Sequence, residues 1–246
     1  MRRFYVAQKS GKVNVVWWRI FAHGMCTIAL KEDNMIALYI TASPKKEPDS
    51  ASKTAGRLFI DAWMRRNPGV QLQQLDLYDA DIPRVNERLM TGRAALPQGE
   101  DLNRLTPEEK AQVQRIDALC SQFIAADRYV IAAPMWSTSF PAILKQYIDC
   151  VIINGKTIHI TPDNVSGMLD DKERRMVYIQ SSGGVYPRIL DRMLNHGEVY
   201  LKDVFKFLGI AKFDAVMVEG VDMTDVGLDA ALEKAATKLD KLAQSF

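Results

Sequence analysis

The sequence predicts an α/β protein built on a single doubly wound parallel sheet. Short apolar runs recur along the chain, each suited to a strand that is covered on both faces. Between them lie longer segments whose apolar residues repeat at helical spacing. The chain has 246 residues, of which 48% are hydrophobic and 25% are charged, and this composition is typical of one sizeable globular domain.

The first strand and helix follow Met35. Residues 36–41 form a short apolar run, as expected of a buried parallel strand. After a loop that contains two prolines, residues 50–66 carry an apolar stripe at helical spacing. The sequence Asn67-Pro68-Gly69 ends this helix.

The second strand, 70–77, precedes a long polar connection over residues 79–105. An irregular stretch of this length usually has a function or forms part of an interface. The sequence Thr106-Pro-Glu-Glu109 is typical of a capping box with proline at the first helical position, so a helix begins there. Apolar residues continue this helix to Phe123.

Each of the three remaining strands is followed by a helix. The predicted strands are 129–133, 175–180 and 215–219, and the predicted helices are 143–151, 190–208 and 228–246. Gly209 closes the second of these helices.

Five strands that alternate with five helices predict helices on both faces of the sheet. The five-stranded parallel doubly wound plan has flavodoxin-like strand order, in which strands one and three meet where the order reverses. No internal repeat competes with this architecture.

Residues 1–34 do not match the rest of the chain. Their apolar part, 13–30, resembles a signal peptide or a short membrane anchor, but an arginine and a histidine interrupt it, and a spanning helix needs roughly 20 apolar residues. Our hypothesis is that Met35 is the true initiator, because codons for residues 31–34 can contain a purine-rich ribosome-binding sequence. A charged linker after an ordered extension is the alternative. We therefore divide the chain into an N-terminal extension and a domain over 35–246.

Composition and residue spacing exclude several functions. The net charge of +2 gives no argument for a nucleic-acid partner. Three cysteines and three histidines are scattered, without a disulfide framework or a zinc signature, so we expect a cytoplasmic protein without a metal site. Cys120 and Cys150 lie on apolar helix faces and are expected to be structural. His159 alternates with isoleucines, which predicts a surface strand or turn.

The loops after strands one, three and four should converge, because ligands of open α/β sheets bind at the carboxyl ends of the strands. After strand one, Ser43, Ser50 and Ser52 offer hydroxyls near a helix start, whose N–H groups and dipole suit phosphate. The alternative is that Asp49 or Ser50 only caps the helix. No GxGxxG or Walker lysine motif is present.

The other two loops suit a flat aromatic ligand. After strand three, Met135 and Trp136 can lie against a ring face. After strand four, residues 181–184 let the backbone approach a ligand edge, because glycine has no Cβ, and Tyr186 follows within reach. A hydrophobic plug and a simple turn are the alternatives. No nucleophile–base pair lies in these loops, so we predict no catalytic side chain and expect a bound cofactor to supply the chemistry.

From Met35 onward the chain resembles the FMN-dependent NADH-azoreductase family, also described as NADH:quinone oxidoreductases. Residues 132–137 with 144–149 are similar to the family's APMYNF…P…LK.Y.D stretch. The serines after strand one match its phosphate-binding serines, and residues 181–184 match its SRGG turn.

The resemblance implies a homodimer with one FMN per subunit near the subunit interface. It implies hydride transfer from NADH or NADPH and delivery of two electrons to a quinone or an azo compound, with no membrane or nucleic-acid partner. The implied cofactor-binding residues are Ser43, Ser50, Ala51, Ser52, Pro134, Met135, Trp136, Ser137, Thr138, Ser181, Ser182, Gly183, Gly184 and Tyr186. A flavodoxin-like electron carrier and a ligand-binding protein without redox chemistry are the alternatives. The lack of a strong charge asymmetry argues against the carrier.

Three residues depart from the family pattern. Ser137 replaces the usual asparagine, Thr138 replaces an aromatic residue and Ser182 replaces arginine, which removes a positive charge. We expect FMN binding to survive these changes, and the flavin potential and substrate preference to differ.

Overall fold

The computed structural model describes residues 35–186 and 194–246. The predicted extension over 1–34 and the beginning of the helix predicted from residue 190 lie outside the described residues. The domain boundary at Met35 therefore stays a prediction.

The described elements alternate between strands and helices. In chain order they are β1 (Ile36–Thr41), the 3-10 helix η1 (Glu47–Asp49), α1 (Ala51–Arg66), β2 (Gln71–Asp76), α2 (Gly99–Asn103), α3 (Pro107–Ala125), β3 (Arg128–Pro134), α4 (Ala142–Val151), β4 (Ile158–Ile160), β5 (Val165–Gly167), β6 (Arg175–Ser182), α6 (His196–Leu208), β7 (Lys212–Glu219) and α7 (Gly227–Ser245).

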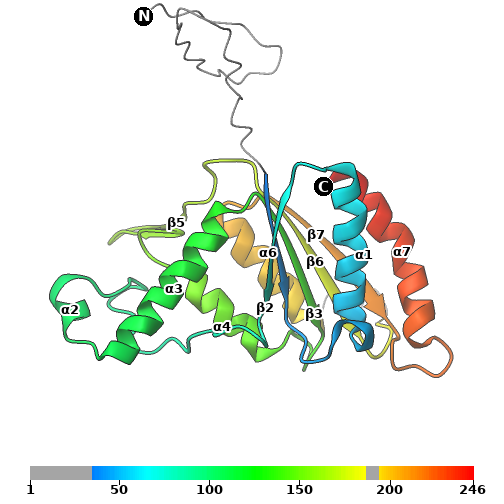
Figure 1. Cartoon of the computed structure of the whole chain (residues 1–246), viewed down its shortest axis with the longest axis horizontal. Coiled ribbons are helices and arrows are strands. Elements are labelled where there is room, and N and C mark those ends of the chain that lie inside the picture. The colour runs from blue at the N-terminus through cyan, green and yellow to red at the C-terminus, as the bar shows by residue number, and fades with distance from the viewer. Residues whose placement is uncertain (1–34, 187–193) are drawn as a thin grey trace, which may run out of the picture. The chain divides into compact units, whose positions relative to one another are not determined.

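The main sheet has five parallel strands in the order β2-β1-β3-β6-β7. Helices α1 and α7 cover one face, and α3, α4 and α6 cover the other (Figure 1). The predicted flavodoxin-like, doubly wound architecture is confirmed. Because β1 connects to β2 on one side and lies beside β3 on the other, the carboxyl ends of β1 and β3 form the point where ligands bind in such sheets.

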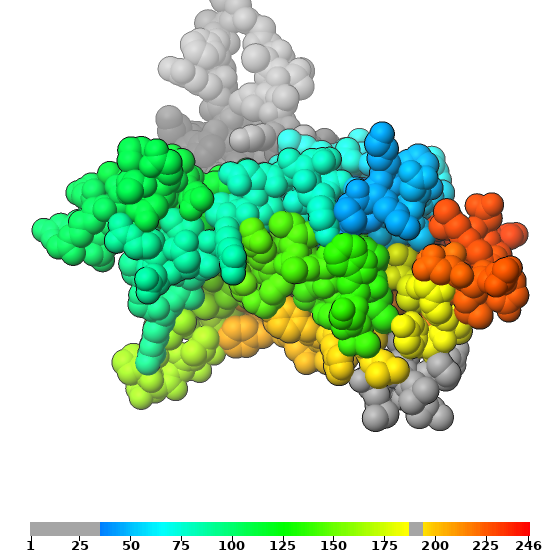
Figure 2. Space-filling model, turned by 90° about the horizontal axis from the view of Figure 1, so that it is seen from below, coloured from blue at the N-terminus to red at the C-terminus, as the bar shows by residue number. Residues whose placement is uncertain are grey.

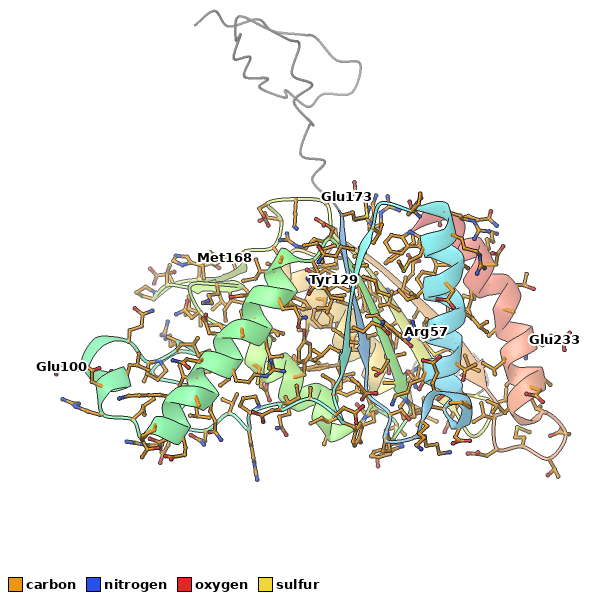
Figure 3. The ribbon with its side chains drawn as sticks, in the orientation of Figure 1. Arg57, Glu100, Tyr129, Met168, Glu173 and Glu233 are labelled. Carbon is orange, nitrogen blue, oxygen red and sulfur yellow. The ribbon has the colours of Figure 1, made fainter. Side chains whose placement is uncertain are left out.

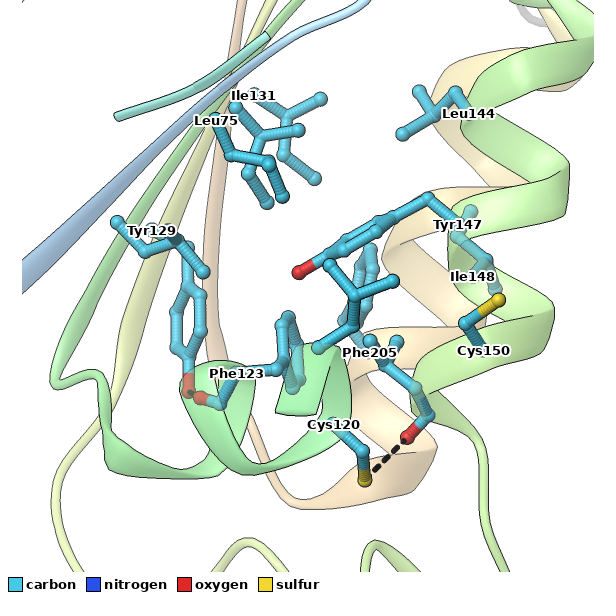
Figure 4. Close-up of a cluster of buried hydrophobic side chains, with 14 of the residues drawn as sticks. Leu75, Cys120, Phe123, Tyr129, Ile131, Leu144, Tyr147, Ile148, Cys150 and Phe205 are labelled. Atoms are coloured by element: carbon cyan, nitrogen blue, oxygen red, sulfur yellow. Dashed lines mark hydrogen bonds between the residues drawn. The ribbon is translucent and has the colours of Figure 1, made fainter. Parts of the chain in front are cut away.

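Alternate residues of each strand contribute to separate cores on the two faces of the sheet. In β1, Leu38 and Ile40 belong to the core under α3, α4 and α6, whereas Ala37 and Tyr39 belong to the core under α1 and α7. Figure 4 shows the first core, in which the rings of Phe123 from α3, Tyr129 from β3, Tyr147 from α4 and Phe205 from α6 meet. This two-sided burial explains why the strands are continuous apolar runs.

The two described cysteines are structural, as predicted. Cys120 and Cys150 are buried free thiols in the core of Figure 4, where Cys120 donates to the Val151 carbonyl at 3.6 Å. Burial raises the pKa of each thiol to about 12. Neither thiol therefore carries the thiolate that nucleophilic chemistry requires near neutral pH.

The C-terminal residue closes the second core. The Phe246 ring meets the rings of Phe59 and Trp63 edge-on, with centroid distances of 5.2 Å in both pairs. Phe246→Ala should lower the free energy of unfolding by about 3 kcal/mol, because it removes buried apolar area and leaves a cavity. The free energy of unfolding is measured by urea titration, with circular dichroism as the signal. Leu58→Ala, at a side chain of α1 that is 46% exposed, is the matched control and should change stability by less than about 0.5 kcal/mol. Equal effects of the two substitutions would contradict the prediction.

Several boundaries differ from the predictions. β6 extends through Ser182, because its last residues continue to pair with β7 (Ser182 with Glu219). β7 begins at Lys212, three residues earlier than predicted, because an edge strand tolerates the exposed polar residues there. The helix predicted over 190–208 is interrupted at Asn195: Leu194 is helical, and the Asn195 side chain accepts from the Glu198 N–H at 3.1 Å and caps a helix that begins at His196. The prediction for residues 190–193 lies outside the described residues.

Four short elements, η1, α2, β4 and β5, were not predicted. The hairpin of β4 and β5 pairs only three residues per strand, too few to establish a period of two in the sequence. The exposed His159 lies on β4, which confirms the prediction of a surface strand. The connection over 79–105 contains α2, and its residues Ile82 and Leu89 are buried in the first core. No helix in the described ranges is long and apolar enough to cross a membrane.

Candidate functional site

A cavity of about 300 Å³ opens at the carboxyl edge of the sheet. Figure 2 looks onto this edge, where the loop after β1 (blue), the loop after β3 (green), the end of β6 (yellow) and the start of α7 (red-orange) gather. Among the described residues, the cavity is lined by Ser43, Pro44, Lys45, Asp49, Ser50, Ala51, Pro134, Met135, Trp136, Ser181, Ser182, Gly183, Val221, Asp222 and Leu228.

The first wall of the cavity is the start of α1. Ser50 caps this helix, and its hydroxyl accepts from the Lys53 N–H at 3.4 Å and lies 3.3 Å from the Ser52 hydroxyl. The N–H groups of Ala51 and Ser52 have no intrahelical acceptor, because they belong to the first turn. Together with the positive end of the helix dipole, they form a site for an anionic group. The capping by Ser50 leaves these N–H groups free of intrahelical partners.

A buried lysine holds the loop of this wall. Lys53 Nζ lies 2.6 Å from Asp76 Oδ2 of β2 and donates to the Lys45 carbonyl at 2.8 Å. Its side chain is 9% exposed. The Lys45 N–H in turn donates to the Ser43 hydroxyl at 3.3 Å. Lys53 therefore ties the loop after β1 to the neighbouring strand and fixes the shape of this side of the cavity.

A second brace lies one turn along α1. Arg57, labelled in Figure 3, donates to Glu47 of η1 and to Gln74 of β2, the latter at 2.6 Å. These contacts fix η1 against the sheet, and η1 leads directly to Ser50.

The loop after β3 is a tight turn. Trp136 and Ser139 exchange two backbone hydrogen bonds of 3.1 and 2.8 Å, and the two residues between them have positive φ, 48° for Ser137 and 60° for Thr138. Such turns favour asparagine and glycine, and a β-branched residue such as Thr138 is strained there. The His196 N–H at the start of α6 donates to the Thr138 carbonyl at 2.9 Å and holds the turn in this conformation.

The end of β6 forms the opposite wall. The Met135 N–H donates to the Ser181 carbonyl at 2.6 Å, which joins the loop after β3 to β6. The Ser182 hydroxyl donates to the Gly184 carbonyl at 2.8 Å and closes the turn after the strand. No group of acidic, histidine or cysteine side chains in the described ranges is placed to hold a metal ion.

Comparisons with known proteins show the family of this chain. Residues 35–243 match the family model described as flavodoxin-like fold. The chain is 48% identical over 205 residues to FMN-dependent NADH:quinone oxidoreductase 1 of Clostridium acetobutylicum, covering 83% of this chain and 93% of that protein. It is 43% identical over 209 residues to the FMN-dependent NADH:quinone oxidoreductase of Ruminiclostridium cellulolyticum, covering 85% and 98%.

The chain belongs to the flavodoxin-like family of FMN-dependent NADH:quinone oxidoreductases. Its structure also resembles that of an FMN-dependent NADH-azoreductase from Bacillus anthracis solved in complex with FMN, with a TM-score of 0.73, 27% identity and coverage of 86% of this chain and 98% of the other.

The structure brings most of the residues implied by the family resemblance to the cavity. Those that line it are Ser43, Ser50, Ala51, Pro134, Met135, Trp136, Ser181, Ser182 and Gly183. Those outside its lining are Ser52, Ser137, Thr138, Gly184 and Tyr186. Ser52 is fully buried behind Ser50, and the Tyr186 N–H donates to Glu219 Oε1 at 3.0 Å.

Sequence reasoning missed two groups of lining residues. The first group is Pro44, Lys45 and Asp49, and the signal for it was the position of these residues between the predicted site residues Ser43 and Ser50. Val221, Asp222 and Leu228 come from the loop between β7 and α7 and the start of that helix. This loop follows a parallel strand and therefore reaches the same edge of the sheet as the other three loops. Its position after the last strand was the signal by which the sequence could have indicated these residues.

Proposed function

We propose that this chain catalyses FMN-dependent transfer of two electrons from NADH to quinones, with reductive cleavage of aromatic azo compounds as a further activity. The observation that carries this proposal is a single cavity that combines an anion-binding helix start with walls suited to a flat ring. The names of the related proteins describe the same reaction.

The residues of the cavity fit FMN. The N–H groups at the start of α1, with the Ser43 and Ser50 hydroxyls, suit its phosphate. Met135 and Trp136 offer a sulfur and an indole to the ring face, and Gly183 lets the opposite backbone approach the ring edge. The volume of about 300 Å³ is at the lower end for ligand sites.

The side chains of the cavity would bind and orient FMN and would not take part in the reaction themselves. Bound FMN would supply the hydride and electron transfer, as cofactors do in such enzymes. The Ser50 end would fix the phosphate, and the hydrogen-bonded Trp136–Ser139 turn would hold one edge of the ring. Trp136 is 46% exposed, so this side of the cavity is open enough for a second flat molecule to stack. We propose that this opening accepts quinones and azo compounds of varied shape.

We further propose that the protein is a homodimer. Apolar side chains are exposed on α6 (Val199 and Phe207) and on the β4–β5 hairpin (Val165 and Met168, the latter labelled in Figure 3). Gly167 packs against the backbone of Phe207, so hairpin and helix form one surface. The rings of Phe140 and Tyr200, 5.7 Å apart, connect this surface to the loop after β3. A second copy on this surface would therefore lie beside the cavity.

Sedimentation analysis tests the dimer. We expect twice the chain mass of 27.7 kDa for the wild type and dissociation in Phe207→Glu, because a charge would then be buried in the interface. Leu58→Glu on α1, at a residue as exposed as Phe207, should remain dimeric. A monomeric wild type, or a dimeric Phe207→Glu, would contradict this interface.

We also propose a cytoplasmic location, since Cys120 and Cys150 are free thiols, as in a reducing compartment. The proposed nicotinamide donor is NADH, and NADPH is the alternative.

The purified protein tests the function in three steps. A visible flavin spectrum is expected, and its absence would favour a ligand-binding protein without redox chemistry. Anaerobic NADH should bleach this spectrum within seconds, whereas failure to do so would favour an electron carrier. Steady-state rates with a quinone, an azo dye and both nicotinamides then define the substrates.

A further inference from the structure

The loop after β7 folds back over the end of β6. Gly220, with φ of +81°, reverses the chain in a conformation that favours glycine. Its N–H donates to the carbonyls of Ser182 and Gly184 at 3.0 and 3.2 Å, and the Val221 N–H donates to the Ser182 carbonyl at 3.1 Å. These bonds fix the next residue, Asp222, at the wall of the cavity.

The Asp222 carboxylate occupies the space beside Gly183. The Asp222 N–H donates to the Gly183 carbonyl at 3.1 Å. A Cβ added at Gly183 would lie 2.5 Å from Asp222 Oδ2 and 3.3 Å from its Cγ. The absence of a side chain at residue 183 is thus what admits the carboxylate to this position.

Among the described residues that line the cavity from the end of β6 and the loop after β7, Asp222 is the charged one. The other charged residues that line the cavity, Lys45 and Asp49, belong to the loop before α1. No other described residue forms an ion pair or hydrogen bond with the Asp222 carboxylate, and the nearby Ser182 is neutral. A carboxylate accepts hydrogen bonds and does not donate them, so it suits a ligand that presents hydroxyl or N–H groups.

We propose that Asp222 is a cofactor-binding residue whose carboxylate accepts a hydrogen bond from a ribityl hydroxyl or ring N–H of the bound flavin. This inference rests on the proposed FMN site. The loop contacts Ser182 and Gly183, so the contact is with the flavin and its sugar chain and not with the phosphate. Two-electron reduction adds negative charge to the flavin, so the fixed carboxylate also lowers its midpoint potential.

Flavin titrations of the FMN-free full-length protein test this assignment. Fluorescence quenching gives dissociation constants for FMN and riboflavin in the wild type, Asp222→Ala, Asp222→Asn and the control Asp225→Asn. Asp225 lies in the same loop but outside the cavity lining. Asp222→Ala should raise the dissociation constants of FMN and riboflavin by a similar factor of about ten, as expected for the loss of one charge-assisted hydrogen bond. Asp225→Asn should bind both flavins as the wild type does.

The midpoint potential separates this role from a structural one. Asp222→Asn should raise the two-electron potential of bound FMN by about 30 mV, equivalent to a tenfold change in the equilibrium constant. Wild-type affinities and potential in both Asp222 variants would overturn the proposal. Tighter binding of FMN alone by Asp222→Ala would also overturn it, because the carboxylate would then face the phosphate. A wild type that binds neither flavin would overturn the FMN site itself.

Discussion

Replacing Ala51 with aspartate should weaken FMN binding by about a hundredfold or more. Ala51 lines the cavity in the first turn of α1, where the N–H groups and the helix dipole favour an anion. A carboxylate there would compete for the same N–H groups and repel a phosphate at short range, where two like charges interact by about 3 to 4 kcal/mol at an effective dielectric constant of 20.

Riboflavin is the matched control for this prediction, because it has the ring and sugar chain but no phosphate. The Ala51→Asp protein should bind riboflavin as the wild type does, while its affinity for FMN falls. Fluorescence quenching measures both, and circular dichroism verifies the fold. Unchanged FMN affinity would show that the phosphate lies elsewhere.

Replacing Lys53 with methionine should both destabilise the fold and weaken FMN binding. The substitution leaves the Asp76 carboxylate, which is 26% exposed, without its partner at 2.6 Å, and removal of one member of a buried pair costs about 3 kcal/mol. It also releases the Lys45 carbonyl, so the loop after β1 loses the contact that shapes the cavity wall.

A double-mutant cycle separates these two effects. Lys53→Met combined with Asp76→Leu removes both charges and should recover most of the stability, as measured by urea unfolding. It should not recover the FMN affinity, because the Lys45 carbonyl still lacks its donor. If the double variant binds FMN as the wild type does, Lys53 has no function in shaping the site.

The sequence patterns predicted the strands and helices because each pattern depends on local burial. The strand order was predicted from the five-stranded doubly wound plan that these elements suggest. The runs 36–40 and 129–133 carry no charged residue and do not alternate between apolar and polar residues, as expected of strands that are covered on both faces. The capping box at Thr106 is a local interaction and is present as predicted, with both side chain–backbone hydrogen bonds formed. By contrast, the pairing that extends β6 to Ser182 depends on β7, which is more than thirty residues away.

The sequence determined the loops that form the site, since parallel strands end at the same edge of the sheet, and the family resemblance implied its serines, ring-contacting residues and turn. Only the tertiary structure decided which side chains face the cavity: Ser52 is buried behind Ser50, and Thr138 holds its turn through His196. Only the tertiary structure also brought Asp222 against Gly183. The reason is physical. Strand and helix periodicity report burial within one segment, whereas the direction of a loop side chain depends on hydrogen bonds to segments that are distant in the sequence.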